Sequence, residues 1–326
     1  MAHEVAVTDG RVAIAYFGQA PWHGLGRRLD NPATAQEAIT AAGLDYEVSL
    51  KPMFTAEGME VPKRRAVVRE DTRVVLGGVG PDYVPIQNTE AFEFLDAIVA
   101  EGGLRYHTAG ALGKGERLWL LAKLPGYVRV KGTEDVTDKY LLLSNSHNGT
   151  SALRVFFTPI RVVCANTLAI AHGRGVGQGI SIVHKGGLRA KVAEAQKMLG
   201  LAHRFYDDLE GQINRLASYY PTLAQLKHYF AALYPEPDNG NGIRTRNIHE
   251  ELFRLFELGR GQDIYGIRRT AWAAYHAITE YVDHHRPTRA AAPQDRSALR
   301  LQSQWFGSGA KLKAKPWDDA LLLVSS

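Results

Sequence analysis

The sequence is short of the residues and patterns that mark several large protein classes. Its only cysteine is Cys164, so it can form neither a disulfide framework nor a cysteine-rich zinc module. No stretch approaches the ~20 consecutive apolar residues that a membrane-spanning helix needs. The first residues have neither the basic start nor the apolar run of a signal peptide. We therefore expect a cytoplasmic protein that does not associate with a membrane.

Sequence motifs of several enzyme classes are absent too. There is no Gly-x-x-x-x-Gly-Lys-Ser/Thr loop and no Gly-x-Ser-x-Gly elbow. The run Gly173–Gly179 follows a predicted helix and precedes a predicted strand, the reverse of the order in a dinucleotide-binding loop. His249-Glu250-Glu251 lacks the second histidine of a zinc protease, because Phe253 stands there. These absences favour a protein without catalytic activity or cofactor, while a metal-dependent nuclease built from scattered carboxylates stays open.

Positive charge is concentrated in the middle of the chain. The formal net charge is only +5, yet between Arg154 and Arg204 the only acidic residue is Glu194. Basic side chains that neutralise phosphates release counterions, which gives affinity for any nucleic acid. The alternative is that these charges merely solvate a surface helix. We predict that six of the basic residues contact phosphates: Arg154, Arg161, Lys185, Arg189, Lys191 and Lys197.

A hairpin and a helix are expected at the start of this basic stretch. Two strand-like runs, Tyr140–His147 and Ser151–Phe157, are joined by Asn148-Gly149, a strong hairpin signal. Thr158 then resembles a helix cap, with Pro159 in the first helical turn. Apolar residues follow at helical spacing: Ile160, Val163, Cys164, Leu168 and Ala171. We interpret Cys164 as a core residue of this helix.

The order of the remaining elements predicts an α+β fold. A helix is expected from a Thr34/Glu37 capping box to Gly43, and another from Asn88 or Thr89 to residue 102. Strands are expected at 44–55, 64–69, 73–79, 104–111 and 117–124, and helices at 188–217, 222–234, 245–258 and 270–283. This order indicates a curved antiparallel sheet with packed helices in the first two-thirds, followed by a mostly α-helical C-terminal region.

Two regions follow from this pattern. Residues 1–187 are predicted to form the α+β core with its hairpins, and residues 188–326 a helical region with a basic C-terminal tail. The tail interleaves cations with the aromatic residues Trp305, Phe306 and Trp317. Its basic residues are Arg296, Arg300, Lys311, Lys313 and Lys315.

Several motifs resemble a known family. They are Pro21–Gly26, Tyr83–Asn88, Thr158–Leu168, Glu280–His284 and Phe306–Lys313. Together they are similar to the phage- and plasmid-like proteins of the domain-of-unknown-function family nine hundred and thirty-two. The resemblance covers nearly the whole chain and implies a protein carried by phages, prophages or plasmids. It implies no catalytic residues.

A more distant similarity concerns the order helix, three strands, helix on an antiparallel sheet. This order is similar to the core of single-strand annealing recombinases of the Red-beta and Rad-fifty-two kind. That similarity implies ATP-independent annealing of single-stranded DNA by a homo-oligomeric ring or filament. Tyr106 or Trp119 would then be a stacking platform for bases, unless each is a packed sheet residue. The alternatives are a non-catalytic factor that binds a host or phage protein, and the metal-dependent nuclease.

Overall fold

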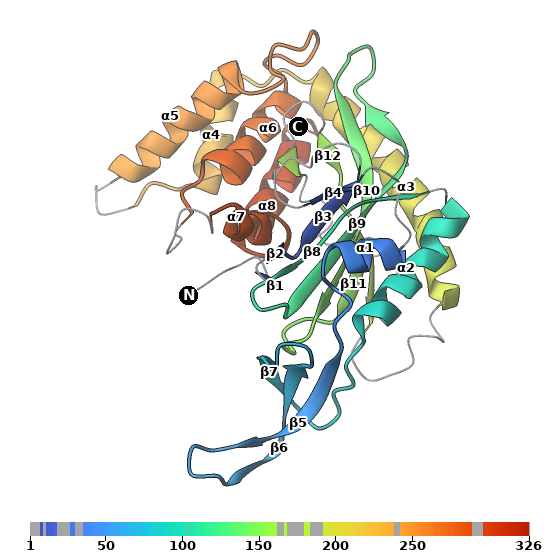
Figure 1. The fold of residues 1–326 in the computed structure, drawn as a ribbon. Coiled ribbons are helices and arrows are strands. Elements are labelled where there is room, and N and C mark those ends of the chain that lie inside the picture. The colour runs from blue at the N-terminus through green and yellow to red at the C-terminus, as the bar shows by residue number, and fades with distance from the viewer. Residues whose placement is uncertain are drawn as a thin grey trace.

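A large antiparallel sheet lies at the centre of the α+β fold (Figure 1). The computed structural model describes residues 7–8, 11–17, 27–29, 35–102, 104–161, 166–167, 179–182, 192–237, 242–288 and 296–325. The strands are β3 (Ile14–Phe17), β4 (Arg27–Leu29), β8 (Arg105–Leu112), β9 (Arg117–Arg129), β10 (Val136–Ser146), β11 (Leu153–Phe157), β12 (Ile160–Arg161), β13 (Asn166–Thr167) and β14 (Gly179–Ile182). Their order is β13-β12-β10-β9-β8-β3-β4, with β11 also beside β10 and β14 beside β11. Among the strands that the structure describes, only β3 and β4 pair in parallel. A separate two-stranded sheet pairs β1 (Val7–Thr8) with β2 (Arg11–Val12).

The predicted hairpins form the middle of this sheet. β8 pairs with β9, β9 with β10, and β10 with β11, each antiparallel. The β10–β11 register runs from Leu141 opposite Phe157 to Ser144 opposite Arg154. Gly149 in the connecting turn has φ +74°, a conformation that a glycine adopts without steric cost. The Asn-Gly signal therefore located this hairpin correctly.

The helix predicted from Thr158 is wrong. The Thr158 N–H donates to the Tyr140 carbonyl at 3.0 Å, and the chain continues along the same edge as β12. Ile160 lies opposite Asp138, and β12 then pairs with β13. The reason is tertiary: β10 extends beyond the end of β11, and its unpaired edge accepts a further strand. Cys164 lies outside the described residues.

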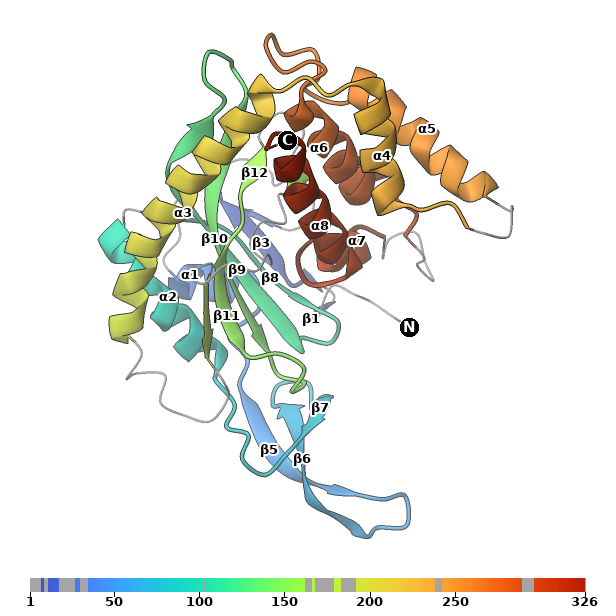
Figure 2. The ribbon, with the colours of Figure 1, turned by 180° about the vertical axis from the view of Figure 1, so that it is seen from behind.

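Helices cover both faces of the sheet (Figures 1 and 2). On the first face, α1 (Ala35–Ala41), α2 (Asn88–Gly102) and α3 (Val192–Ser218) pack against alternate strand residues such as Leu120 and Leu143. On the second face, Trp119, Leu142 and Phe156 pack against α7 (Arg296–Phe306). The Trp119 and Trp305 rings meet edge to face, with centroids 5.1 Å apart. This contact ties the C-terminal helices to the sheet.

The C-terminal region is helical, as predicted. It contains α4 (Leu223–Leu233), α5 (Ile243–Leu258), α6 (Ala271–Glu280), a π-helical turn (Tyr281–His285) and α8 (Ser308–Leu323). The stretch predicted as a basic tail forms α7 and α8, and Lys313 is fully buried there. Its ammonium nitrogen lies 2.6 Å from the Asp283 carboxylate. No helix among the described residues is long and apolar enough to cross a membrane.

A small sheet stands away from the body (Figures 1 and 2). It consists of β5 (Val48–Phe54), β6 (Glu60–Arg69) and β7 (Val75–Val79), and the β5–β6 hairpin, residues 48–69, is called the arm here. All three strands were predicted. At its root, Gly77 lies against the turn after β10: a Cβ at Gly77 would be 2.6 Å from the Asn148 Cα. The Tyr83 hydroxyl also donates to the Ser146 carbonyl, so the arm is anchored at this turn.

The buried His276 and the half-buried His107 predict sensitivity to acid. Burial, together with the Arg161 cation, holds the pKa of His276 well below its usual value. Burial lowers the pKa of His107 to about 4. The unfolded chain binds protons at about pH 6.5 and the folded chain does not, so acid favours unfolding. We expect the free energy of unfolding to fall between pH 6.5 and 4, by up to about 1.4 kcal/mol per pH unit for each histidine.

Urea unfolding at several pH values measures this slope. The variant His107→Gln is expected to flatten it. The exposed His228 on α4 provides the control, because His228→Gln is expected to leave the slope unchanged. An identical slope in wild type and His107→Gln would contradict the assignment.

Candidate nucleic-acid interface

The six predicted phosphate contacts are found in different settings. Arg154 lies on β11 and is exposed. Lys197 belongs to α3, but its side chain is not among those described. Lys185, Arg189 and Lys191 follow β14 in the sequence and lie outside the described residues. The structure therefore places one of the six on an exposed surface.

Arg161 is enclosed in the core. Its guanidinium donates to both carboxylate oxygens of Asp135, with the shortest contact 2.6 Å, and also to the Gly261 carbonyl at 3.1 Å. The indole N–H of Trp272 donates to the same carboxylate at 2.8 Å. The Arg161 side chain is 0% exposed and that of Asp135 1%. Arg161 therefore joins the sheet to α6 and has no surface to offer a phosphate.

Arg154 shares its sheet face with a second arginine, Arg117. The face is defined by register: Arg117 on β9 lies opposite Ser146, and Arg154 on β11 lies opposite Ser144. Because side chains of paired residues point to the same face of a sheet, the two arginines flank β10 on one side of the sheet. Ser181 of β14, opposite Arg154, extends the row. We call these residues the arginine–serine strip: Arg117, Ser144, Ser146, Arg154 and Ser181.

The strip begins where the cover of α7 ends. Further along the same face, Trp119 and Phe156 are buried beneath α7. Phe306, the last residue of α7, lies at the boundary, with the Arg117 guanidinium carbon 5.1 Å from its ring centroid. Arg117 also donates to the Thr150 hydroxyl at 3.2 Å. Ring and hydroxyl thus hold the Arg117 head group at the edge of the uncovered face.

The positive charges of the two arginines lie close enough to repel each other. Within the described part of the chain, neither forms an ion pair with a carboxylate. Partial burial lowers the pKa of Arg117, and the nearby Arg154 cation lowers it further. The Glu116 carboxylate acts in the opposite direction, but it also accepts a hydrogen bond from the Lys114 N–H in the preceding turn. An anion between the two guanidinium groups would relieve their mutual repulsion.

The chemistry of the strip suits a phosphodiester. Guanidinium groups bind phosphate oxygens with charge-assisted hydrogen bonds, and the exposed Ser181 hydroxyl can donate to the same oxygens. Ser144 and Ser146 are buried beneath this row, and the Ser146 hydroxyl donates to the Asn148 side chain. Arg117 was not among the residues predicted from the sequence. The sequence did contain a signal for Arg117, namely the predicted strand 117–124. Because side chains alternate between the two faces of a strand, Arg117 lies on the same face as Trp119. Which face remains uncovered depends on α7, which no local pattern reveals.

Neither predicted stacking residue is available. Trp119 is 0% exposed and Tyr106 is 4% exposed, so both are packed sheet residues, the alternative left open above. No group of three or more His, Cys, Asp or Glu side chains that could hold a metal ion occurs among the described residues.

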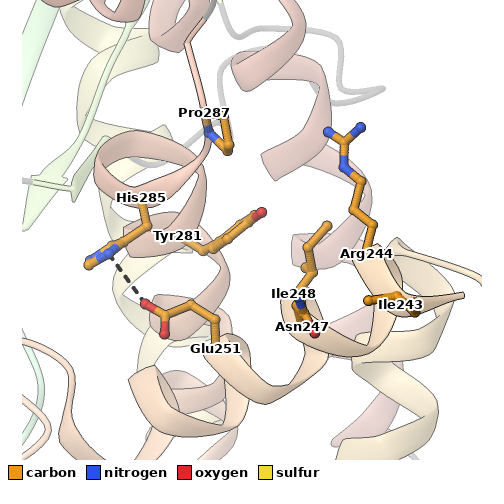
Figure 3. A pocket seen from close by; sticks show the side chains of 8 residues that line it. All are labelled: Ile243, Arg244, Asn247, Ile248, Glu251, Tyr281, His285 and Pro287. Atoms are coloured by element: carbon orange, nitrogen blue, oxygen red, sulfur yellow. Dashed lines mark ion pairs between the residues drawn. The ribbon is translucent and has the colours of Figure 1, made fainter.

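A separate pocket of about 700 Å³ lies between α5 and the π-helical turn (Figure 3). Tyr281 and His285 face Glu251 across it, and the His285 Nδ1 lies 3.3 Å from the Glu251 carboxylate. Arg254 holds the same carboxylate through two 2.7 Å hydrogen bonds, which lowers the Glu251 pKa. Arg244 at the pocket rim carries the remaining charge. Because the Glu251 carboxylate lines this pocket and would repel a phosphate, the pocket is less suited to a polyanion than the strip.

Comparison with known proteins gives one match. Residues 75–305 match a family model described as Domain of unknown function (DUF932). The matched span contains the strip, the buried Arg161–Asp135 pair and the pocket. No curated protein matches the chain, and no solved structure matches it.

Proposed function

The chain belongs to the DUF932 family, and from this premise we propose that it is a DNA-binding accessory protein of a phage, prophage or plasmid. The setting in mobile elements rests on the resemblance of its motifs. Binding of single-stranded DNA rests on the strip. In a single strand the bases have no pairing partner and the phosphates are accessible to basic side chains.

One observation carries the DNA-binding proposal. Arg117 and Arg154 lie on one sheet face, without a carboxylate ion pair among the described residues, at the edge of the cover that α7 provides. Structural arginines usually have acidic partners, as Arg161 has in Asp135. An anion bound between the two guanidinium groups would be attracted by both of them.

Removal of the two strip charges tests this site. The double variant Arg117→Gln with Arg154→Gln is expected to weaken binding of a single-stranded oligonucleotide by about tenfold or more, since a hydrogen bond to a charged group contributes ~1.5–3 kcal/mol. The dependence of affinity on salt is expected to become shallower by about 1.4 in the log–log slope, because two phosphate contacts are lost. Fluorescence anisotropy across a salt series measures both quantities.

The matched control removes two exposed charges elsewhere. Lys227 on α4 and Arg246 on α5 are exposed and lie on the helical side of the molecule (Figure 1). Lys227→Gln with Arg246→Gln changes the net charge by the same amount and is expected to leave both quantities nearly unchanged. Equal losses in the two double variants would mean that only net charge matters, and the strip would not be the site.

Within this proposal, the most specific activity is ATP-independent annealing of complementary strands by a homo-oligomer. Its support is the sequence order α1, β5–β7, α2, on which the recombinase similarity was based, although β5–β7 form a separate small sheet and not part of the central one. Annealing of labelled complementary oligonucleotides, without nucleotide or metal, measures it. A protein-binding factor would instead show no salt-dependent DNA binding, and a nuclease would shorten the oligonucleotide when divalent metal is added.

A further inference from the structure

Beyond its pairing with β7, which spans Arg65 to Val68, the arm is a two-stranded ribbon. Figures 1 and 2 show the β5–β6 hairpin extending from the sheet into solvent. At its tip Phe54 is 59% exposed and Met59 62% exposed. A two-stranded ribbon is marginally stable in water by itself, and large exposed apolar side chains on a protruding element mark a contact surface.

A bulge displays three cations beside this tip. Pro52 lies opposite Arg65 and Phe54 opposite Glu60, so β6 advances five residues while β5 advances two. The additional residues of β6 loop out, and Lys63 has φ +58°, a left-handed conformation that a side chain seldom adopts. Such a distortion in an exposed ribbon adds nothing to its own stability. It turns a run of basic residues outward: Lys63, Arg64 and Arg65.

These cations are available for an external partner. All three are exposed, and none forms an ion pair within the described part of the chain. The other cations of this small sheet are engaged: Lys51 and Arg73 both lie against Glu70. The tip also carries the exposed acids Glu57 and Glu60. A mixture of acids, cations and apolar side chains fits a protein surface better than a phosphate backbone.

The complementary surface is on α3 of the same sequence. Asp207, Asp208 and Glu210 are exposed on that helix, and in the described structure none of them forms an ion pair. At the end of α3 the chain also exposes two large apolar residues, Tyr220 at 63% and Leu223 at 61%. This surface offers carboxylates to the three arm cations and apolar area to Phe54 and Met59. We call it the acidic face of α3.

We propose that the arm of one subunit docks on the acidic face of α3 of a second copy of this chain. The contact joins two different surfaces, so in a pair the first subunit keeps a free acidic face and the second keeps a free arm for further neighbours. Such a heterologous contact generates a ring if the rotation closes and a filament if it does not. This inference rests on the proposed function, because the proposed annealing protein acts as a ring or filament.

A charge swap tests the docking. The arm variant, Lys63→Glu with Arg64→Glu and Arg65→Glu, is expected to reduce the mass in solution to that of one chain. The face variant, Asp207→Lys with Asp208→Lys and Glu210→Lys, is expected to do the same. Combining all six substitutions in one chain restores opposite charges across the contact and is expected to restore the assembly. Size-exclusion chromatography with light scattering, over a range of protein concentrations, measures each mass.

Three outcomes would overturn the interface. The wild-type protein could have the mass of one chain at every concentration, or the six-fold variant could fail to reassemble although circular dichroism shows it folded. Alternatively, the arm variant could keep its mass and lose DNA affinity, which would assign the arm to DNA. A control with three reversed charges elsewhere, Lys227→Glu with Arg246→Glu and Lys311→Glu, is expected to keep the wild-type mass.

The strip variant separates this inference from the proposed function. Arg117→Gln with Arg154→Gln is expected to assemble normally and to lose DNA affinity. If it binds DNA as the wild type does, the DNA site is wrong and the interface still stands. If it binds weakly while the charge swap fails, the interface is wrong and the DNA site stands.

Discussion

Replacing Arg161 with methionine is expected to lower the free energy of unfolding by about 3–5 kcal/mol, because it leaves the Asp135 carboxylate buried without its guanidinium partner. The carboxylate keeps the Trp272 N–H, which cannot neutralise its charge. The lost contacts also separate β12 from the loop at Gly261. Urea unfolding followed by circular dichroism measures the change.

The exposed Arg154 on the adjacent strand is the matched control. Arg154→Met is expected to change stability by less than about 0.5 kcal/mol, as surface substitutions usually do. The two variants thus separate the structural Arg161 from Arg154, the proposed phosphate contact, on one sheet. If Arg161→Met were as stable as wild type and bound DNA weakly, Arg161 would be a phosphate contact after all and its buried position would be wrong.

Replacing Lys313 with methionine is expected to have an effect of similar size, about 3–5 kcal/mol, for the same physical reason. Lys313 and Asp283 are both fully buried, and their charged groups are 2.6 Å apart. Burial lowers the pKa of Lys313, while the Asp283 carboxylate acts to raise it. Removing the ammonium group leaves the carboxylate charge unbalanced in the interior of the helical region.

A second substitution identifies the source of this loss. Adding Asp283→Asn to Lys313→Met removes the unbalanced charge and is expected to recover part of the stability. The exposed Lys311, two residues away, is the control, since Lys311→Met is expected to have little effect. If the double variant were less stable than Lys313→Met by the full cost of an independent mutation, the two side chains would not be coupled.

Local signals predicted most elements, and they failed where distant residues decide. The Asn148-Gly149 turn fixes a hairpin because it needs only its own backbone geometry. Thr158 and Pro159 carry equally good local signals for a helix, yet the free edge of β10 near Asp138 takes the chain as a strand. α7 and α8 were read as a basic tail because the partner of Lys313 is thirty residues earlier in the sequence.

The candidate site was predictable only in part, for the same reason. Charge counting found both Arg154 and Arg161, but it could not tell the exposed arginine from the buried one. The partner of Arg161 is Asp135, which comes before β10 in the sequence. Arg117 lies outside the charge-rich stretch altogether. Its place beside Arg154 follows from the pairing of β9, β10 and β11, a property of the folded sheet.

The close approach of Gly77 to Asn148 has a consequence for stoichiometry. Thr150, which holds Arg117, belongs to the same turn, so the origin of the arm and the proposed phosphate site share one corner of the fold. In an assembly linked by arms, successive phosphate sites would then recur at a constant interval. Each protomer would occupy a fixed number of nucleotides, and titration to saturation with oligonucleotides of increasing length would show evenly spaced steps.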